Sequence, residues 1–205
     1  PSQRAVNLPK LYKVPEKSKE RLCVFRVERS LECNPALSAS VQLMLVPSAS
    51  PLAHAEGSQN VVVVDGLRSG ETALSGFGAG GDPTAVAVVS DVIAISSNDS
   101  HTNNWPRQIP NAIAQTDFDS AHYIRLIVID RPGIISELAR IFATHDINID
   151  SLLQESGWSK TELPFVITLE RCNTSAVRKA LVEIQRFDFH ARAPFWMPIL
   201  ARGET

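Results

Sequence analysis

The sequence predicts an α+β protein in two parts: a partial mixed sheet with one helix, followed by a unit of four strands and two helices. Three observations support this fold class. Runs of β-branched and apolar residues of strand length recur along the chain of 205 residues. Three other segments have helix length, and two of them carry apolar residues at helical spacing. A polar stretch with two prolines, at residues 96–122, separates the two parts.

The first part opens with about 20 residues rich in Pro, Lys and Ser, which we interpret as a tail or a linker. The strand-like runs that follow cover residues 21–29, 41–47, 61–66 and 72–78. Residues 31–40 are expected to form a polar loop between the first two runs. Several strands in close succession imply an antiparallel or mixed sheet. A helix is expected over Ala85–Ile95, with Asp82 as its N-cap and Pro83 at its first position.

A glycine-dense loop joins the last of these strands to the helix. Gly76, Gly78 and Gly81 have the spacing of a dinucleotide-binding fingerprint, in which backbone N–H groups approach a phosphate. The polar loop after the helix stands where a second parallel strand is needed, so the match is not a complete nucleotide-binding unit. The alternative is a turn that only allows tight packing between strand and helix.

The second part begins with a strand over Tyr123–Asp130, which ends at the Arg-Pro-Gly turn of residues 131–133. A helix is expected to start there, with Asp130 as its N-cap and Pro132 near its first position. Apolar residues then recur at helical spacing at positions 134, 138, 141 and 142.

The remaining elements complete a recognisable order. Residues 147–154 and 163–171 read as a β-hairpin with a longer loop, and a second amphipathic helix follows the capping side chains of residues 173–175. A short strand over His190–Phe195 is expected to be limited by Pro194 and Pro198. The order βαββαβ predicts a ferredoxin-like unit with both helices on one face of an antiparallel sheet and the other face free for a partner.

The stretch VIDRPGIISELARIFATHDINIDSLLQ within this unit resembles an ACT domain, the small module that binds amino acids in enzymes of amino-acid metabolism. The resemblance implies that Asp130 and Asn148 hold an effector across a dimer interface, with Gly133 letting the backbone come close. A zwitterion needs an acceptor for its ammonium group and free N–H groups for its carboxylate. The alternative is purely structural, since Asp130 is a good helix cap and Asn148 an ordinary turn residue.

A second resemblance covers roughly residues 20–200. The segments SPLAHAEGSQNVVVV and ETALSGFGAGGDPTAVAVVSDVIAI, followed by a linker and an ACT domain, resemble the C-terminal part of homoserine dehydrogenase, an NAD(P)-dependent oxidoreductase of the aspartate pathway to threonine and methionine. The resemblance implies that Gly78, Gly80 and Thr84 are cofactor-binding positions, with Gly80 against the cofactor. It also implies that the helix returns the chain to the nucleotide-binding domain.

The departures from that family are equally informative. The family's nucleotide-binding Rossmann domain, its catalytic Lys and its homoserine-binding acidic residues are absent from these 205 residues. Ser50 stands where the family usually has His before Pro-Leu-Ala. No residue is therefore assigned a catalytic role, and we expect NAD(P) to be bound by the parent enzyme rather than by this chain alone.

We expect residues 1–97 to be the C-terminal part of a homoserine dehydrogenase catalytic domain, 98–121 a linker, and 122–205 an ACT regulatory domain. The expected function is regulation and dimerisation of that enzyme, with threonine as the amino-acid effector. One alternative is a stand-alone ACT-type regulator without catalysis, and another is a purely structural dimerisation piece.

The composition excludes several other classes of protein. A net charge of −2 argues against nucleic-acid binding, and no apolar run approaches the roughly 18 residues of a membrane span. Three cysteines, at positions 23, 33 and 172, are an odd number without metal-ligand spacing, so neither a disulfide framework nor a zinc site is expected. The five histidines are scattered, so no metal site is expected. The expected location is the cytoplasm, and the expected assembly is a homodimer or a larger homo-oligomer.

Overall fold

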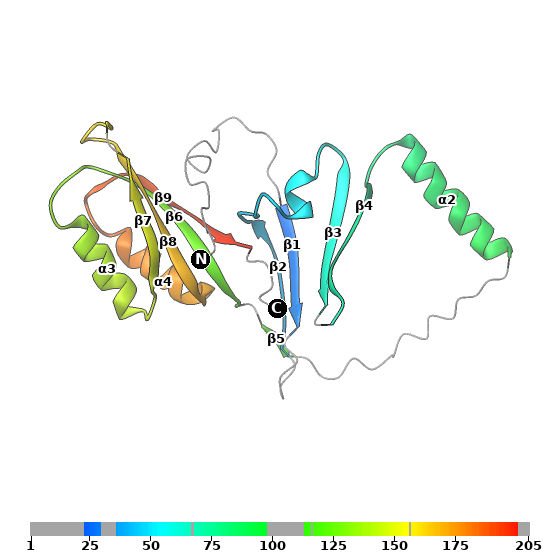
Figure 1. Ribbon diagram of the computed structural model, residues 1–205, viewed down its shortest axis with the longest axis horizontal. Coiled ribbons are helices and arrows are strands. Elements are labelled where there is room, and N and C mark those ends of the chain that lie inside the picture. The colour runs from blue at the N-terminus through cyan, green and yellow to red at the C-terminus, as the bar shows by residue number, and fades with distance from the viewer. Residues whose placement is uncertain are drawn as a thin grey trace.

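The computed structural model describes residues 23–29, 36–66, 68–97, 113–115, 117–155 and 157–200, and these residues form three separate sheets (Figure 1). The predicted tail at residues 1–20 and most of the predicted linker lie outside them. A three-stranded sheet and a two-stranded sheet belong to the first part of the chain, and a four-stranded sheet belongs to the second.

The three-stranded sheet has the order β1-β2-β5. β1 (Cys23–Arg29) pairs antiparallel with β2 (Ala36–Leu43), and β5 (Ile113–Gln115) adds to β2 in parallel. β2 starts five residues before the predicted run, so the expectation of a polar loop up to Ser40 was wrong. Small polar residues such as Ser38 and Ser40 are held in the strand by their pairing with β1, which local propensity does not report.

The two-stranded sheet is the antiparallel hairpin of β3 (Gln59–Gly66) and β4 (Gly70–Phe77), as the third and fourth strand-like runs predicted. A short 3-10 helix, η1 (Pro51–His54), precedes it, with Ser50 Oγ accepting a hydrogen bond from the backbone N–H of Leu52 at 3.3 Å. One face of the hairpin exposes Val62 and Leu74, which are direct cross-strand partners. The hairpin therefore leaves an apolar face uncovered.

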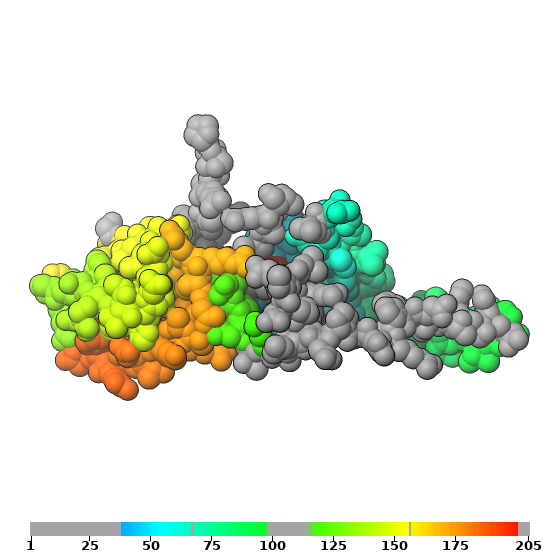
Figure 2. All heavy atoms as spheres, turned by 90° about the horizontal axis from the view of Figure 1, so that it is seen from below, coloured from blue at the N-terminus to red at the C-terminus, as the bar shows by residue number. Residues whose placement is uncertain are grey.

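The helix of the first part, α2 (Gly81–Ser96), begins one residue before Asp82. Gly80 is its N-cap, so the prediction that Asp82 caps the helix and Pro83 opens it was wrong. The reason is a backbone turn at Gly80, whose φ of 134° is accessible to glycine. Every residue of α2 except the half-buried Pro83 is exposed. Figures 1 and 2 show the helix at one end of the molecule, beyond the hairpin.

The second part has the predicted order βαββαβ. Its elements are β6 (Asp119–Val128), α3 (Ile134–Thr144), β7 (Ile149–Gln154), β8 (Leu163–Asn173), α4 (Thr174–Ile184) and β9 (His190–Ile199). All neighbouring strands are antiparallel in the sheet order β7-β8-β6-β9, and Figure 1 shows both helices on one side of the sheet. The ferredoxin-like prediction is confirmed.

Two local expectations for this part were wrong. α3 begins after Gly133, which is in the left-handed region with φ 96°, so Asp130 and Pro132 stand outside the helix rather than at its start. β9 runs through both Pro194 and Pro198 to Ile199. Because β9 is an edge strand of the sheet, a residue without an N–H is tolerated there.

One hydrophobic core holds the second part together, and its members come from the inner face of the sheet and from both helices. The largest fully buried members are Phe142, Phe189, Ile124, Leu126, Leu138, Ile141, Ile167, Leu169 and Ile184. The two parts of the chain meet at an isolated parallel bridge between Leu45 and Ile199. Among the residues that the structure describes, this core cluster belongs to the second part, and backbone pairing joins that part to the first.

Candidate functional site

The loop from β6 to α3 borders a pocket of about 310 Å³. The lining residues come from the end of β6, this loop, the first turn of α3, the end of β7 and the start of β8: Val128, Asp130, Arg131, Pro132, Gly133, Ile134, Ile135, Ser136, Gln154, Leu163 and Phe165. Val128, Leu163 and Phe165 are buried and form its apolar part. The pocket thus combines an apolar floor with a few polar groups, which is the usual composition of a small-molecule site.

The first turn of α3 faces this pocket without a capping side chain from the described residues. Gly133 supplies the N-cap position in left-handed backbone geometry, and its carbonyl accepts the Glu137 N–H at 3.0 Å. An ideal Cβ at Gly133 has nothing within 4 Å, so the constraint at this position is backbone conformation rather than space. Uncapped N–H groups at a helix N-terminus attract a carboxylate.

Asp130 and Gly133, two of the predicted effector residues, line this pocket together. Asp130 is exposed, and its backbone N–H donates to the carbonyl of Lys160 at 2.6 Å, which ties the loop to the β7–β8 connection. Its carboxylate is therefore close to solvent and available to a cationic group.

Asn148, the third predicted effector residue, is not part of the pocket. It immediately precedes β7, whereas Gln154 at the opposite end of that strand lines the pocket. Six strand residues separate these ends by about 20 Å. Asn148 Nδ2 donates to Glu170 Oε2 at 3.2 Å. Within one chain, Asn148 and Asp130 cannot touch the same small ligand.

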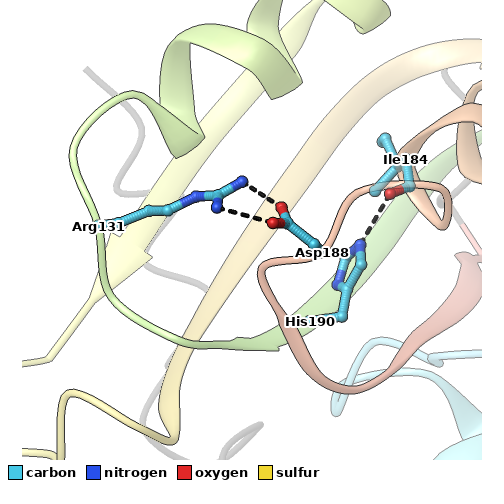
Figure 3. A network of polar contacts seen from close by, with 4 residues as sticks. All are labelled: Arg131, Ile184, Asp188 and His190. Atoms are coloured by element: carbon cyan, nitrogen blue, oxygen red, sulfur yellow. Dashed lines mark hydrogen bonds and ion pairs between the residues drawn. The ribbon is translucent and has the colours of Figure 1, made fainter.

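Sequence reasoning missed an ion pair at the pocket's rim (Figure 3). Arg131 Nη1 donates to Asp188 Oδ2 at 3.2 Å, and Arg131 Nη2 donates to Asp188 Oδ1 at 2.5 Å. The hydrogen bond to Arg131 lowers the pKa of the Asp188 carboxyl group and raises the pKa of the guanidinium. The two residues are 57 positions apart, so no local sequence pattern predicts the pair.

Of the predicted cofactor residues, Gly78 and Gly80 lie on the exposed loop between β4 and α2, and Thr84 lies in the exposed first turn of α2. The Thr84 hydroxyl donates to the Gly80 carbonyl oxygen at 2.7 Å, which closes the first turn of α2. An ideal Cβ at Gly78 would stand 2.0 Å from Nδ2 of the exposed Asn60 side chain, so a larger residue at position 78 would require this flexible side chain to move. This placement at the start of α2 fits a backbone surface for a phosphate, and it fits a tight turn between strand and helix equally well.

A buried histidine lies on the helix-covered face of the sheet, away from the pocket. His122 Nδ1 accepts a hydrogen bond from Trp196 Nε1 at 3.2 Å, so the imidazole proton sits on Nε2, which donates to the Cys172 carbonyl oxygen at 3.3 Å. Burial lowers the pKa of His122 from 6.5 to about 4, against the opposing effect of the Cys172 carbonyl and of Asp117 and Asp119. This group is neutral at pH 7 and structural.

Other functional classes find no support among the residues that the structure describes. No group of three or more His, Cys, Asp or Glu side chains there could hold a metal ion. Burial raises the pKa of the Cys172 thiol to about 11, so this free cysteine is not a nucleophile at pH 7. The Cys23 side chain and Cys33 lie outside the described part. No helix in the described ranges is long and apolar enough to cross a membrane.

Comparison with known families supports the architecture in both parts of the chain. The homoserine dehydrogenase family model matches residues 8–93, and the ACT domain model matches residues 122–187. The chain is a relative of the C-terminal part of homoserine dehydrogenase, with an ACT domain. The β4–α2 glycine loop falls within the first match, and Asp130, Gly133 and Asn148 fall within the second.

Individual homoserine dehydrogenases show the same partial coverage. The enzyme of Helicobacter pylori is 30% identical over 144 residues, which are 69% of this chain and 34% of that protein. The enzyme of Mycobacterium tuberculosis is 35% identical over 128 residues, which are 60% of this chain and 29% of that protein. The chain thus spans about a third of the length of the curated homoserine dehydrogenases that it matches.

A solved structure supports the fold across both parts. The homoserine dehydrogenase of Thiobacillus denitrificans superposes with a TM-score of 0.71 at 24% identity, covering 87% of this chain and 43% of that one. The S. aureus homoserine dehydrogenase at pH 8.5 gives a TM-score of 0.51 at 18% identity, with 86% and 42% covered. At these identities the likeness establishes the arrangement of strands and helices.

Proposed function

We propose that this chain is the regulatory and dimerisation portion of an NAD(P)-dependent homoserine dehydrogenase. We also propose that its ACT domain binds an amino acid in the β6–α3 pocket, with threonine as the first candidate. The observation that carries the proposal is the pocket at the uncapped N-terminus of α3, with the Asp130 carboxylate on its rim. The ACT domain match at residues 122–187 supports the same reading.

The chemistry of the pocket suits a zwitterion. The carboxylate of the amino acid would accept hydrogen bonds from first-turn N–H groups of α3, where the helix dipole favours negative charge. Its ammonium group would donate to Asp130. The side chain would then lie toward Val128, Leu163 and Phe165, and the methyl group of threonine is compatible with that apolar floor.

A second copy of the chain completes this proposed site. Asn148 stands about 20 Å from the pocket in its own chain, so its amide reaches an effector only from a partner subunit. Its hydrogen bond to Glu170 is exposed and exchangeable. We therefore include a homodimer in the proposal, and sedimentation in dilute buffer tests it: a dimer or larger species is expected, and a monodisperse monomer contradicts it.

The first part of the chain fits a contribution to the cofactor side of a larger enzyme. In the parent enzyme, hydride transfer between the nicotinamide and C4 of homoserine would interconvert homoserine and aspartate semialdehyde. Gly78, Gly80 and Thr84 would lie beside NAD(P) in that enzyme. Residues 1–97 would be the remnant of the catalytic domain, residues 98–121 a linker and residues 122–205 the regulatory domain. α2 supports this because its exposed aliphatic side chains need a covering surface. The chain alone should be inactive and located in the cytoplasm.

A stand-alone amino-acid-binding regulator is the second candidate. One observation favours it: the ACT part has a complete core of its own, whereas none of the residues of α2 is buried. The two candidates differ in whether the first part meets a cofactor. The chain can be mixed with a homoserine dehydrogenase polypeptide truncated before this region, and NADPH binding is then followed by fluorescence titration. If this chain is a portion of the enzyme, adding it restores NADPH binding and turnover. If it is a stand-alone regulator, neither is restored.

Titration calorimetry tests the amino-acid site. Threonine is titrated into the chain, with isoleucine, methionine and serine as comparisons, and the same series is repeated with Asp130→Ala. Asp91→Ala, on the exposed α2 helix, is the matched control. We expect saturable heat with threonine, its loss in Asp130→Ala and its retention in the control. Equal binding by both variants removes Asp130 from the site, and no heat with any amino acid refutes the sensor.

A further inference from the structure

The Arg131–Asp188 pair connects the rim of the pocket to the turn between α4 and β9. Both Nη atoms of Arg131 contact the two carboxylate oxygens of Asp188, and the guanidinium carbon lies 5.6 Å from the ring centroid of Phe189. Planar two-point pairing of this kind fixes orientation better than a single contact. The backbone N–H of Ile129 adds a hydrogen bond to the Phe189 carbonyl at 2.8 Å.

The turn itself is fixed on its other side to α4. His190 Nε2 donates to the carbonyl oxygen of Ile184, the last residue of α4, at 2.8 Å (Figure 3). The turn thus lies between the α4 terminus and the pocket loop. Asp188 falls just beyond the residues matched by the ACT domain model, which end at 187.

β9 leads from this turn to the first part of the chain. Over its ten residues it covers about 30 Å. At its far end the Leu45 N–H donates to the Pro198 carbonyl at 2.9 Å, and the Leu200 N–H donates to the Leu45 carbonyl at 2.8 Å. Ser120 Oγ also donates to the Ile199 carbonyl at 2.7 Å. β9 therefore connects the turn that contacts the pocket loop, at one end, to the first part of the chain at the other.

The pairing of β9 with β6 is uneven along its length. Residues near Ile199 pair in continuous register, from Ala121 to Arg125 of β6, whereas the register shifts twice between Arg125 and Val128. The irregular part contains Pro194 and begins at His190, two residues after Asp188. The start of β9 is therefore held less by ladder hydrogen bonds and more by the turn that Arg131 contacts.

We propose that Asp188 is a positioning residue through which occupancy of the amino-acid pocket is communicated, by way of β9, to the contact between Leu45 and Ile199. The proposal rests on the proposed function, because it assigns the route by which that pocket regulates the first part. A ligand at Asp130 changes the position of the adjacent Arg131, Arg131 holds Asp188, and the displaced turn shifts the start of β9.

Hydrogen–deuterium exchange of the full chain, read at the amides of Leu45 and Leu200, tests the link without any ligand. Asp188→Asn removes the charge at constant size, and we expect exchange at both amides to become about twofold to fivefold faster, the range for one exposed ion pair. Glu137→Gln, which disrupts the exposed Arg140–Glu137 pair on α3, is the matched control and should change neither amide. Unchanged exchange in Asp188→Asn overturns the proposal.

Charge reversal provides the positive check. The double variant Arg131→Asp with Asp188→Arg should return both amides toward the original rate, which a general loosening of the fold would not do. With saturating threonine, exchange at Leu45 and Leu200 should slow in the unaltered chain and stay constant in Asp188→Asn. If threonine binds and exchange responds equally in both chains, the proposed role of Asp188 is contradicted. If no amino acid binds, the proposed function is contradicted, and the comparison of exchange rates without ligand still tests the role of Asp188.

Discussion

The indole N–H of Trp196 donates to Nδ1 of His122 across 3.2 Å, and this bond fixes the tautomer of a fully buried imidazole. The two residues belong to neighbouring strands, β9 and β6, and their rings lie 5.7 Å apart between centroids. Both ring nitrogens are satisfied only in the neutral form, because a protonated ring has no acceptor for the Trp196 donor.

This relationship predicts acid sensitivity of the ACT part. The pKa of His122 is about 4 in the folded chain against 6.5 for an unperturbed histidine, so the unfolded chain binds more protons between these values. Stability is therefore fully present above pH 6.5 and falls as the pH drops toward 4, by about 3 kcal/mol in total. Urea unfolding at pH 7, 5.5 and 4.5 measures the loss. His122→Gln should reduce the change in unfolding free energy with pH. If the variant shows the same pH dependence as the unaltered chain, His122 is not its cause.

Gly133→Ala should destabilise the chain and weaken amino-acid binding together. A side chain at φ 96° is strained by about 1 to 2 kcal/mol, and relieving the strain changes the direction of the first turn of α3. Thermal unfolding and calorimetric titration measure the two effects. Gly76→Ala is the matched control, because an ideal Cβ there has nothing within 4 Å and the backbone is not left-handed. Equal effects of both changes would argue against a special role of Gly133.

Two aliphatic residues of α3 should separate stability from binding. Leu138 is 1% exposed, and Leu138→Ala should cost about 2 to 5 kcal/mol of unfolding free energy by leaving a cavity. Ile135 is 49% exposed and lines the pocket, so Ile135→Ala should change stability by less than about 0.5 kcal/mol while lowering amino-acid affinity. Denaturant unfolding and titration of both variants check this. If Leu138→Ala lowers amino-acid affinity without lowering stability, the assignment of Leu138 to the core and of Ile135 to the pocket is wrong.

The apolar side chains of α2 should be dispensable in this chain on its own. Val86, Val89 and Ile93 share one helix face and are between 56% and 66% exposed. Replacing all three by Lys should leave the unfolding midpoint unchanged and lower association beyond the dimer in light scattering. Ile124→Lys, at a buried core position, is the contrasting variant and should prevent folding. A large fall in the midpoint of the triple variant would show that α2 packs within the chain.

The order of elements in the ACT part followed from periodicity alone, since alternation at period 2 and apolar spacing near 3.6 each indicate one element. The exact ends did not. The start of α3 depends on the left-handed backbone of Gly133, and the length of β9 depends on its place at the sheet edge. β5 has three residues and gives no signal of its own. Edge position and short parallel pairing are properties of the folded chain, not of any window in the sequence.

The residues of the candidate site also divide into those that the sequence predicts and those that only the structure reveals. Asp130 and Gly133 are close in sequence, and the structure places both at one pocket. Asn148 was grouped with them through a family resemblance, and in one chain it lies a strand length away. Gln154 and Asp188 reach the pocket region from distant elements, so only the three-dimensional arrangement reveals them. The role of each as an effector residue stays a prediction.

Amide proton–nitrogen spectra of the isotope-labelled chain, recorded during titration with threonine, test most directly whether an amino acid binds in the β6–α3 pocket. We expect saturable shifts at the amides of Ile134, Ile135 and Ser136, because the carboxylate of the amino acid accepts hydrogen bonds from the first turn of α3. Amides in the middle of α2 should not move, and Asp130→Ala should abolish the shifts. Shifts confined to other elements, or none in a folded dimer at saturating threonine, would contradict the amino-acid site.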